Sequence, residues 1–426
     1  MQLSLPVAAT RGGTTWSEVS SAVGEDARGN SFREMVRRAG IGFFPLEFVA
    51  KLPLALTIVG VLSLVTVERG SIADAGITSG ILGLASAICA PLIGLAADRW
   101  GQRRVLMPVA LVNGATLLLL TATVYADPPL WGLFVVAVLV GASSPQIGPM
   151  GRARWIGMMS RKLDERHLSA AMGWESMTDE IGFIVGPLLV GVLTSLINPA
   201  APVIAGAVIV FVFAFGFAIH PTHAHAPVMA REMSEAKIRI FTPRIVTLAG
   251  GMVLIGLFWG VTLVTVTDLA EEAGLPGAGG FVYGAMGGAA SISALATGLL
   301  TPRITLPLRW VMGAMFALLA SLPLLLAADL LWIGVWFFFV GVGLGPVLVT
   351  LFTLAAELAP LGRGTTVMTI VSGGSVIGQA AGTSGGGVLL EQLGAHAGFI
   401  ASVVLLAVLT SLAVGHFRLT RAPAVA

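Results

Sequence analysis

The sequence predicts an all-α protein that crosses a membrane many times. Of its 426 residues, 56% are hydrophobic and only 11% are charged, and long apolar runs follow one another from residue 43 onward. A soluble domain usually carries about 25% charged residues. A chain so poor in charge cannot cover a surface that faces water, and lipid is therefore its expected main solvent.

Composition also excludes several classes of protein. A net charge of +2 is too small to indicate a nucleic-acid partner. The single Cys89 lies in an apolar run, which excludes a disulfide framework and a cysteine-rich metal site. The first 40 residues are polar and lack the apolar segment of a secretory signal, so the first spanning helix is expected to direct insertion. We expect neither a metal nor a cofactor.

Apolar runs of about 20 residues, enough for one crossing of a bilayer core about 30 Å thick, divide the chain. Their expected positions are 43–67, 73–97, 105–125, 130–151, 169–197, 201–220, 244–267, 278–301, 309–327, 330–356, 364–390 and 394–417. The sequence therefore predicts twelve transmembrane helices.

The charges of the loops give the expected orientation, because cytoplasmic loops are enriched in Arg and Lys. One set of alternate loops carries Arg99, Arg103, Arg104, Arg152, Arg154, Arg161, Lys162, Arg166, Arg231, Lys237, Arg239, Arg244, Arg303, Arg309 and Arg363. The other set carries Glu68, Asp74, Asp127, Asp268, Glu271, Glu272, Asp329 and Glu391, with Arg69 as its basic exception. We therefore expect a multi-pass protein of the cell membrane with both termini in the cytoplasm.

A few weak internal repeats each pair one helix with the helix six positions later. Leu64–Val67 and Leu263–Val266 carry the same four residues, and Gly94 and Arg99 align with Gly298 and Arg303. Such repeats indicate two six-helix bundles related by pseudo-symmetry. The expected units are a tail over 1–42, bundles over 43–220 and 244–418, a cytoplasmic linker over 221–243, and a tail over 419–426. The first tail is expected to be disordered, with a membrane-surface helix from Ser31 to Arg38 as the alternative.

A short charged turn separates the second and third apolar runs. It reads Gly94-Leu-Ala-Ala-Asp98-Arg99-Trp-Gly101-Gln-Arg103-Arg104. The glycines allow a tight turn and close helix approach, and the arginines anchor the loop at the inner membrane face. Asp98 can face the positive N-terminal end of a neighbouring helix. A basic topogenic turn alone would explain neither the glycines nor the aspartate.

This turn resembles the pattern G-x-x-x-D-R-x-G-x-R-R, which marks the loop between helices 2 and 3 of the major facilitator superfamily. The resemblance implies two six-helix bundles that rock about a central cavity. It also implies that Gly94, Asp98, Arg99, Gly101, Arg103 and Arg104 form a gating loop. In the family this loop favours the outward-open state, and here Asp98 would dock against the start of helix 11, at Gly364–Thr366.

A second motif lies in the fifth apolar run, where Gly182, Gly186, Pro187 and Gly191 stand at regular spacing. Small residues four apart allow close helix packing, and the proline can kink the helix. The stretch resembles the G-x-x-x-G-P motif in helix 5 of the family's antiporters, which seals the substrate cavity against leak. The trailing double glycine is absent, and ordinary helix packing is the alternative interpretation.

The same helix carries Glu175, Asp179 and Glu180 near mid-membrane. Charged residues at this depth usually face a cavity and serve a function. We expect these acids to form a central site for proton coupling, together with Lys51 of the first helix. A structural pair with a basic residue is the alternative for Asp179 or Glu180. Likewise, Lys51 is expected to pair with Glu47, unless it partners an acid of the fifth helix or an anionic substrate group.

Other polar and aromatic residues are assigned structural roles. Arg152 and Arg154 are expected to be anchors at the inner membrane face. Family antiporters often place an arginine within helix 4, whereas residues 140–150 contain none. The aromatic residues Trp174, Trp259, Trp332, Trp336, Phe337, Phe338 and Phe339 are expected to pack between helices or face lipid, with an apolar substrate pocket as the alternative. His220, His223 and His225 are expected to lie in a solvated loop rather than to bind metal.

Among functions, the sequence favours proton-coupled export of small, partly hydrophobic molecules, similar to that of drug:proton antiporters. The expected partners are the substrate, protons and lipid, and the expected state is a monomer. Import of a sugar, organic acid or peptide and a non-transporting sensor remain alternatives. An intramembrane enzyme is not expected, because no paired aspartates or mid-helix histidine stand at membrane depth. No G-x-x-x-x-G-K-[ST] phosphate loop supports an ATP-driven pump.

Overall fold

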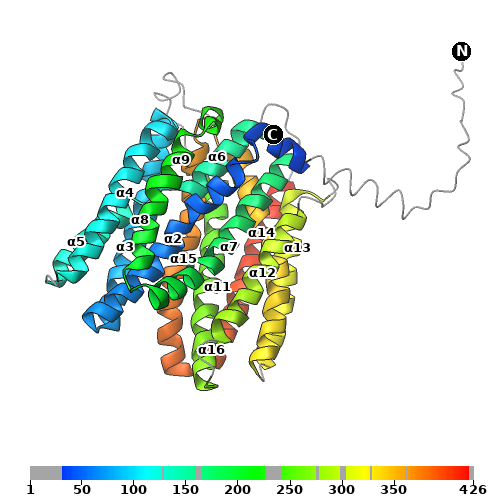
Figure 1. Cartoon of the computed structure of the whole chain (residues 1–426). Helices are drawn as coiled ribbons and strands as arrows, with labels where there is room; N and C mark the ends of the chain where they lie inside the picture. Colours follow the sequence, from blue (N-terminus) through cyan, green and yellow to red (C-terminus); the bar gives the residue numbers. More distant parts are fainter. Residues whose placement is uncertain are drawn as a thin grey trace, which may run out of the picture.

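The helices of this chain run side by side in one bundle, as the computed structural model shows (Figure 1). The structure describes residues 31–126, 129–159, 165–226, 241–274, 278–297, 304–326, 329–360 and 362–421. Within these ranges every regular element is helical. The fold class predicted from composition, an all-α membrane protein, is confirmed.

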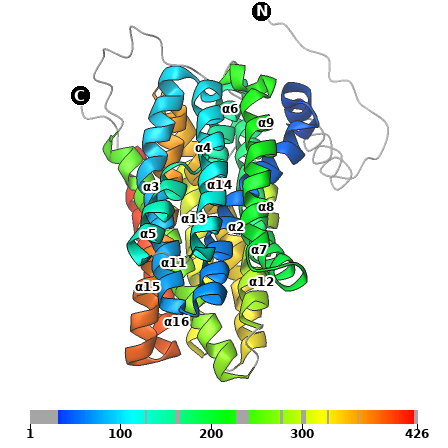
Figure 2. The same ribbon diagram turned by 60° about the vertical axis from the view of Figure 1, so that its left-hand side comes forward.

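We group the helices that precede and follow residues 227–240 into two sets. The N-terminal set comprises α2 (Phe43–Arg69), α3 (Ile72–Trp100), α4 (Gln102–Tyr125), α5 (Leu130–Ala142), α6 (Ile147–Met159), α7 (Glu165–Leu196), α8 (Ala201–Ile209), η2 (Val210–Ala214) and α9 (Phe215–Ile219), followed by η3 (Pro221–His225). The C-terminal set comprises α11 (Pro243–Glu272), α12 (Ala278–Thr297), α13 (Leu306–Ser321), η4 (Leu322–Leu326), α14 (Leu330–Leu358), α15 (Gly364–Leu393) and α16 (Ala395–Arg421). We call these the N half and the C half (Figure 2).

Ten segments of the described chain are long and apolar enough to cross a membrane. The long helices α12 and α15 lie in the same bundle but are not among these ten. Both are rich in glycine, serine and threonine, which lower the mean hydropathy. The expected count of twelve transmembrane helices is therefore not confirmed.

The fourth apolar run differs from the expected single helix over 130–151. It is broken at residues 143–146, between α5 and α6, where Pro145 cannot donate a backbone hydrogen bond. Beyond the break, α6 continues to Met159, so Arg152 and Arg154 lie inside a helix rather than after it. Both arginines are 1% exposed or less, and the expectation that they anchor the inner membrane face is wrong.

The segment before the first span contains a helix over residues 31–39, which is the alternative given for the tail. Met35 and Ala39 lie on the buried face of this helix, and Arg38 donates a hydrogen bond to the carbonyl oxygen of Met158 at the end of α6. On its outer side, Arg37 and Arg38 hydrogen-bond the Glu34 carboxylate and hold its pKa at about 2. The helix thus packs against the N half.

Several expectations concern residues outside the described ranges. They include the tail 1–30, most of the linker at 227–240, and Asp127, Arg161, Lys162, Gly298 and Arg303.

Glycines hold α11 and α15 of the C half together. A Cβ at Gly378 or Gly382 of α15 would press on the backbone carbonyl oxygens of Val253 or Leu257 of α11. Apolar chains gain little from burial against each other in lipid, so close backbone packing of this kind stabilises helix pairs. The glycines that lower the hydropathy of α15 therefore fix its position.

We predict that Gly382→Ala destabilises the protein, because the added methyl group must separate α15 from α11. Overpacking of this kind costs about 1–3 kcal/mol. The measurement is thermal unfolding of the purified protein in detergent. Gly385→Ala is the control, because a Cβ there meets nothing within 4 Å. Equal unfolding temperatures for the two variants would contradict the close contact.

Candidate functional site

A cavity of about 140 Å³ lies between the two halves. The N half lines it from α2, α3, α6, α7 and the break between α5 and α6, and the C half from α11, α14 and α15. Its charged lining residues are Lys51, Arg152, Asp179 and Glu180, and all of them belong to the N half. The wall from the C half includes Met252, Trp259, Leu348, Phe352 and Val376. The cavity thus has one charged wall and one largely apolar wall.

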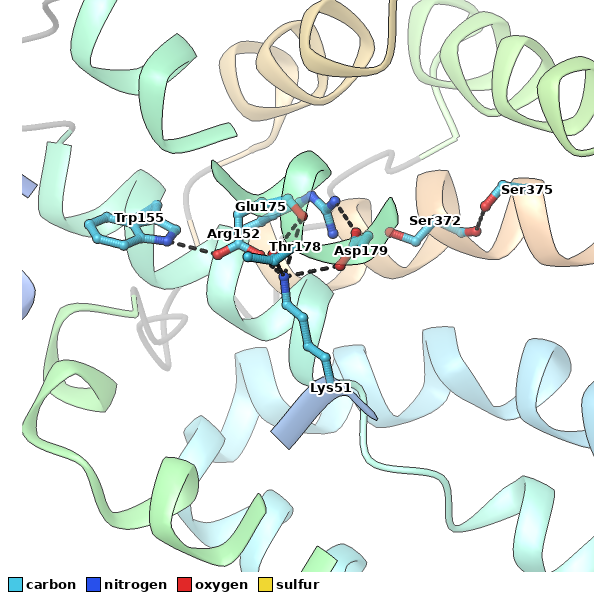
Figure 3. A network of polar contacts seen from close by, with 8 residues as sticks. All are labelled: Lys51, Arg152, Trp155, Glu175, Thr178, Asp179, Ser372 and Ser375. Carbon is cyan, nitrogen blue, oxygen red and sulfur yellow. Dashed lines mark hydrogen bonds and ion pairs between the residues drawn. The ribbon is translucent and has the colours of Figure 1, made fainter. Parts of the chain in front are cut away.

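Lys51 reaches from α2 to two acids of α7 (Figure 3). Its Nζ atom lies 2.5 Å from Glu175 Oε2 and 3.0 Å from Asp179 Oδ1, and it donates to the Thr178 hydroxyl at 2.8 Å. The Trp155 indole donates to the other Glu175 oxygen at 2.8 Å. The expected pair of Lys51 with Glu47 is wrong, and the alternative partner, an acid of the fifth helix, is the one found.

Arg152 completes this cluster from α6. Its Nη2 atom lies 2.5 Å from Asp179 Oδ2, so Asp179 stands between Lys51 and Arg152 (Figure 3). Gly148, one turn before Arg152, provides space, because a Cβ there would lie 3.2 Å from Arg152 Nη1. The sequence analysis assigned Arg152 to the inner membrane face instead of this cluster, because its expected helix ends at 151.

Glu180 differs from its two neighbouring acids. It lines the cavity with 8% of its surface exposed, and no hydrogen bond or ion pair from the described residues reaches its carboxylate. Glu175 and Asp179, in contrast, each contact at least one cation. Among the three acids named from sequence, Glu180 is thus the one whose charge no described cation balances.

Glu47 is a second buried acid near this cluster, and the sequence analysis did not expect its burial. It is fully buried, and neither of its carboxylate oxygens has a hydrogen-bond partner among the described residues. A Cβ on Gly151 would press on Glu47 Oε1 and lie 3.0 Å from Glu175 Oε1. Two acids therefore share the space over one glycine, away from the cavity lining.

The two halves meet where the turn between α3 and α4 contacts the start of α15; we call this the closed end of the cavity. Asp98 accepts hydrogen bonds from the backbone amides of Thr365 at 3.0 Å and Thr366 at 2.7 Å, and from the Thr366 hydroxyl at 2.6 Å. These amides are the free donors at the N-terminus of α15, where a negative charge is stabilised. The turn itself depends on Gly101, whose φ of 90° disfavours other residues.

Gly94 lets α3 and α15 approach each other near the closed end. A Cβ there would lie 2.6 Å from the Thr369 hydroxyl and 3.2 Å from the Thr365 carbonyl oxygen. Farther along α3, a Cβ on Gly83, which lines the cavity, would meet nothing within 4 Å. A Cβ on Gly373 of α15 would meet the Ala87 carbonyl oxygen of α3 only at 3.9 Å, so the two helices approach most closely near the closed end, and both line the cavity farther along.

Gln102 is a further contact between the halves that the motif pattern leaves unspecified. Its amide nitrogen donates to the carbonyl oxygen of Met150 at 3.1 Å and to the Thr365 hydroxyl at 3.3 Å. Its amide oxygen accepts from Arg154 at 2.8 Å. Arg154 also donates to Thr222 of η3, at 2.9 Å, and lies over the Phe217 ring. This fully buried arginine thus connects the closed end to the segment that follows α9.

The remaining motif residues make fewer contacts. Arg103 and Arg104 are exposed, and Arg99 lies near the ring of Trp100. On α7, Gly186 packs against Ala55 of α2, whereas a Cβ at Gly182 or Gly191 would meet nothing within 4 Å. Pro187 lies inside the helix.

Most of the aromatic residues named from sequence do not line the cavity. Trp259 does, whereas Trp174 packs on Phe44 and Trp332 on Trp336. His220 lies against the Phe43 ring, and burial, together with the charge of Arg154, lowers the pKa of His220. No group of acids, histidines and cysteines suited to a metal ion occurs among the described residues.

Two helix sets, a cavity between them and buried charges on its wall define a polytopic membrane transporter. The chain belongs to the Major Facilitator Superfamily, whose family model matches residues 43–383.

Solved structures of transporters share this fold. The human organic anion transporter MFSD10 (TETRAN) is 17% identical over 88% of this chain and 99% of its own, with a TM-score of 0.68. A bacterial homologue of the iron transporter ferroportin, in an outward-facing state with soaked iron, is 16% identical over 87% of this chain and 97% of its own, with a TM-score of 0.67. No curated protein matches the chain significantly.

We predict that Asp98→Asn weakens the closed end. The variant loses the charge that interacts with the α15 N-terminus, a contact worth about 2 kcal/mol in partly buried geometries, so the ratio of closed to open molecules should fall about thirtyfold. The measurement uses two spin labels, attached to cysteines introduced at the exposed positions Ile41 and Thr305, and reports the distance between the halves at this end. The native Cys89 is replaced by serine so that it is not labelled. Asp74→Asn, at the opposite end of α3, is the control. An unchanged distance distribution for Asp98→Asn would contradict this role.

Proposed function

We propose that this protein exports small, partly hydrophobic molecules in exchange for protons, by alternating access. The observation that carries the proposal is Glu180, a buried carboxyl group on the cavity wall that no described cation neutralises. A carboxylate at membrane depth is costly and usually serves a function. Glu180 is therefore the group that we assign to bind and release the transported proton.

The other charges of the cavity support a partly hydrophobic substrate. Lys51 and Arg152 are both paired with acids, which leaves no described cation of the lining free for an anionic substrate. The opposite wall offers Met252, Trp259 and Leu348. Ligand pockets that combine an apolar lining with a few polar groups accept molecules of that character.

In the proposed cycle, the cavity exposes Glu180 on the side away from the closed end. Protonation of Glu180 removes a buried charge, and substrate that carries or tolerates positive charge leaves as the proton binds. The halves then rock about the cavity and open the closed end. The same reasoning assigns Glu175 and Asp179 to hold Lys51 and Arg152 in place rather than to carry the proton.

The location of the protein forms part of the proposal. We assign it to the plasma membrane as a monomer, with both termini and the α3–α4 turn in the cytoplasm. The basic residues on that side of the chain, among them Arg103 and Arg104, support this orientation. In this orientation the described structure is closed toward the cytoplasm.

We predict that Glu180→Gln abolishes uptake driven by a proton gradient in inverted vesicles, because an amide neither binds nor releases a proton near neutral pH. Exchange of labelled for unlabelled substrate, which needs no net proton movement, should continue. The substrate is identified first, by comparing the drug susceptibility of cells that carry the gene with that of cells that lack it. A change in resistance that a protonophore abolishes marks the drug as a substrate of proton-coupled export.

Glu391→Gln is the matched control, since Glu391 is an exposed acid near the far end of α15. Full gradient-driven uptake by Glu180→Gln protein would show that proton coupling is assigned to the wrong residue. If the gene changed susceptibility to none of the drugs, import of a substrate or a sensory role would be favoured over export.

A further inference from the structure

Arg152 contacts both halves of the protein at once. Within the N half, its guanidinium group pairs with Asp179 at 2.5 Å. Its Cζ atom lies 3.7 Å from the centre of the Phe352 ring, which belongs to α14 of the C half. Arg152 is 1% exposed and Phe352 is 4% exposed, so water screens this contact little.

The charged groups around Arg152 belong to the N half, so the Phe352 ring is the group of the C half that its guanidinium contacts. Its Nε atom is buried without a hydrogen-bond partner among the described residues. The charged groups of its cluster and of the cavity wall, namely Lys51, Glu175, Asp179 and Glu180, come from α2 and α7, and Asp179 pairs with it. The C half offers the guanidinium the face of an aromatic ring, which attracts a cation most strongly where water is excluded.

The contact between Arg152 and Phe352 lies between the two halves, so it depends on whether the closed end is closed or open. On the side of the closed end, the two halves also meet through Asp98 and the N-terminus of α15. If α14 and α15 move away from α6 and α7, Phe352 leaves Arg152, and the guanidinium group keeps only Asp179. Opening of the closed end therefore breaks the contact between Arg152 and Phe352, whereas the ion pair inside the N half persists.

We propose that Arg152 is a positioning residue that latches the closed end: Asp179 holds its guanidinium group in the N half, and the Phe352 ring of the C half docks on it. This inference rests on the proposed transport cycle. It extends that cycle by connecting the ion-pair cluster of the N half to the position of the C half. The Asp179 carboxylate holds the arginine in place for the ring, so replacing this carboxylate with a neutral amide releases the arginine and weakens closure.

The test replaces the ring without changing any charge. Phe352→Leu keeps an apolar side chain, and we expect the ratio of closed to open molecules to fall about tenfold, in line with a desolvated cation–π contact. Phe352→Trp should retain closure, because indole is the best ring for this contact. The readout is the spin-label distance between Ile41→Cys and Thr305→Cys, and Phe338→Leu, an exposed aromatic on α14, is the control.

A double-mutant cycle separates the latch from ordinary packing. In an Arg152→Gln background, Phe352→Leu should have little further effect, and the same non-additivity is expected with Asp179→Asn. An equal effect of Phe352→Leu with and without Arg152, or equal loss of closure in the Leu and Trp variants, would overturn the proposal. The distances are measured without substrate or proton gradient, so this result stands apart from that of the vesicle assay.

Discussion

A charge buried in a membrane protein is costly unless it is paired within the protein, and this constraint shapes the N half. Lys51, Arg152, Glu175 and Asp179 stand on three helices, α2, α6 and α7, and neutralise one another. Removal of one partner from a buried ion pair typically costs about 3–5 kcal/mol. The cluster therefore fixes these three helices relative to one another, and it does so on the wall of the cavity.

This rigid, charged half faces a C half held together by different means. Among the described residues, α11 and α15 pack through glycines, whose added Cβ atoms would press on the facing backbone. The halves pack against each other mainly through α3 with α15 and α7 with α12, where Gly94 and Gly173 allow close approach. The polar and cation–π contacts between them include the Asp98 carboxylate at the α15 N-terminus, the Gln102 amide at Thr365 and the Arg152 guanidinium at Phe352. Such a boundary is suited to two bodies that separate and rejoin.

The sequence predicted the fold class well, because composition and apolar run length depend only on the solvent. It predicted the site less well. The acids of α7 were found from their depth alone, but the partners of Lys51 depend on how α2 and α7 face each other, which no local pattern encodes. Arg152 was misplaced because the span was ended too early. The Ser143-Ser144-Pro145 interruption within an apolar run was the available signal for a broken helix that continues beyond it.

The charged residues of the cavity lie on one wall, so the other wall can change without altering the ion pairs. Substitutions among the uncharged C-half residues, such as Met252, Trp259 and Val376, alter the shape offered to a cargo without touching the ion pairs across from them. In the proposed cycle, such substitutions change the surface that meets the cargo and leave Glu180 and the ion pairs in place. A lineage that altered the charged wall instead would have to replace several groups together.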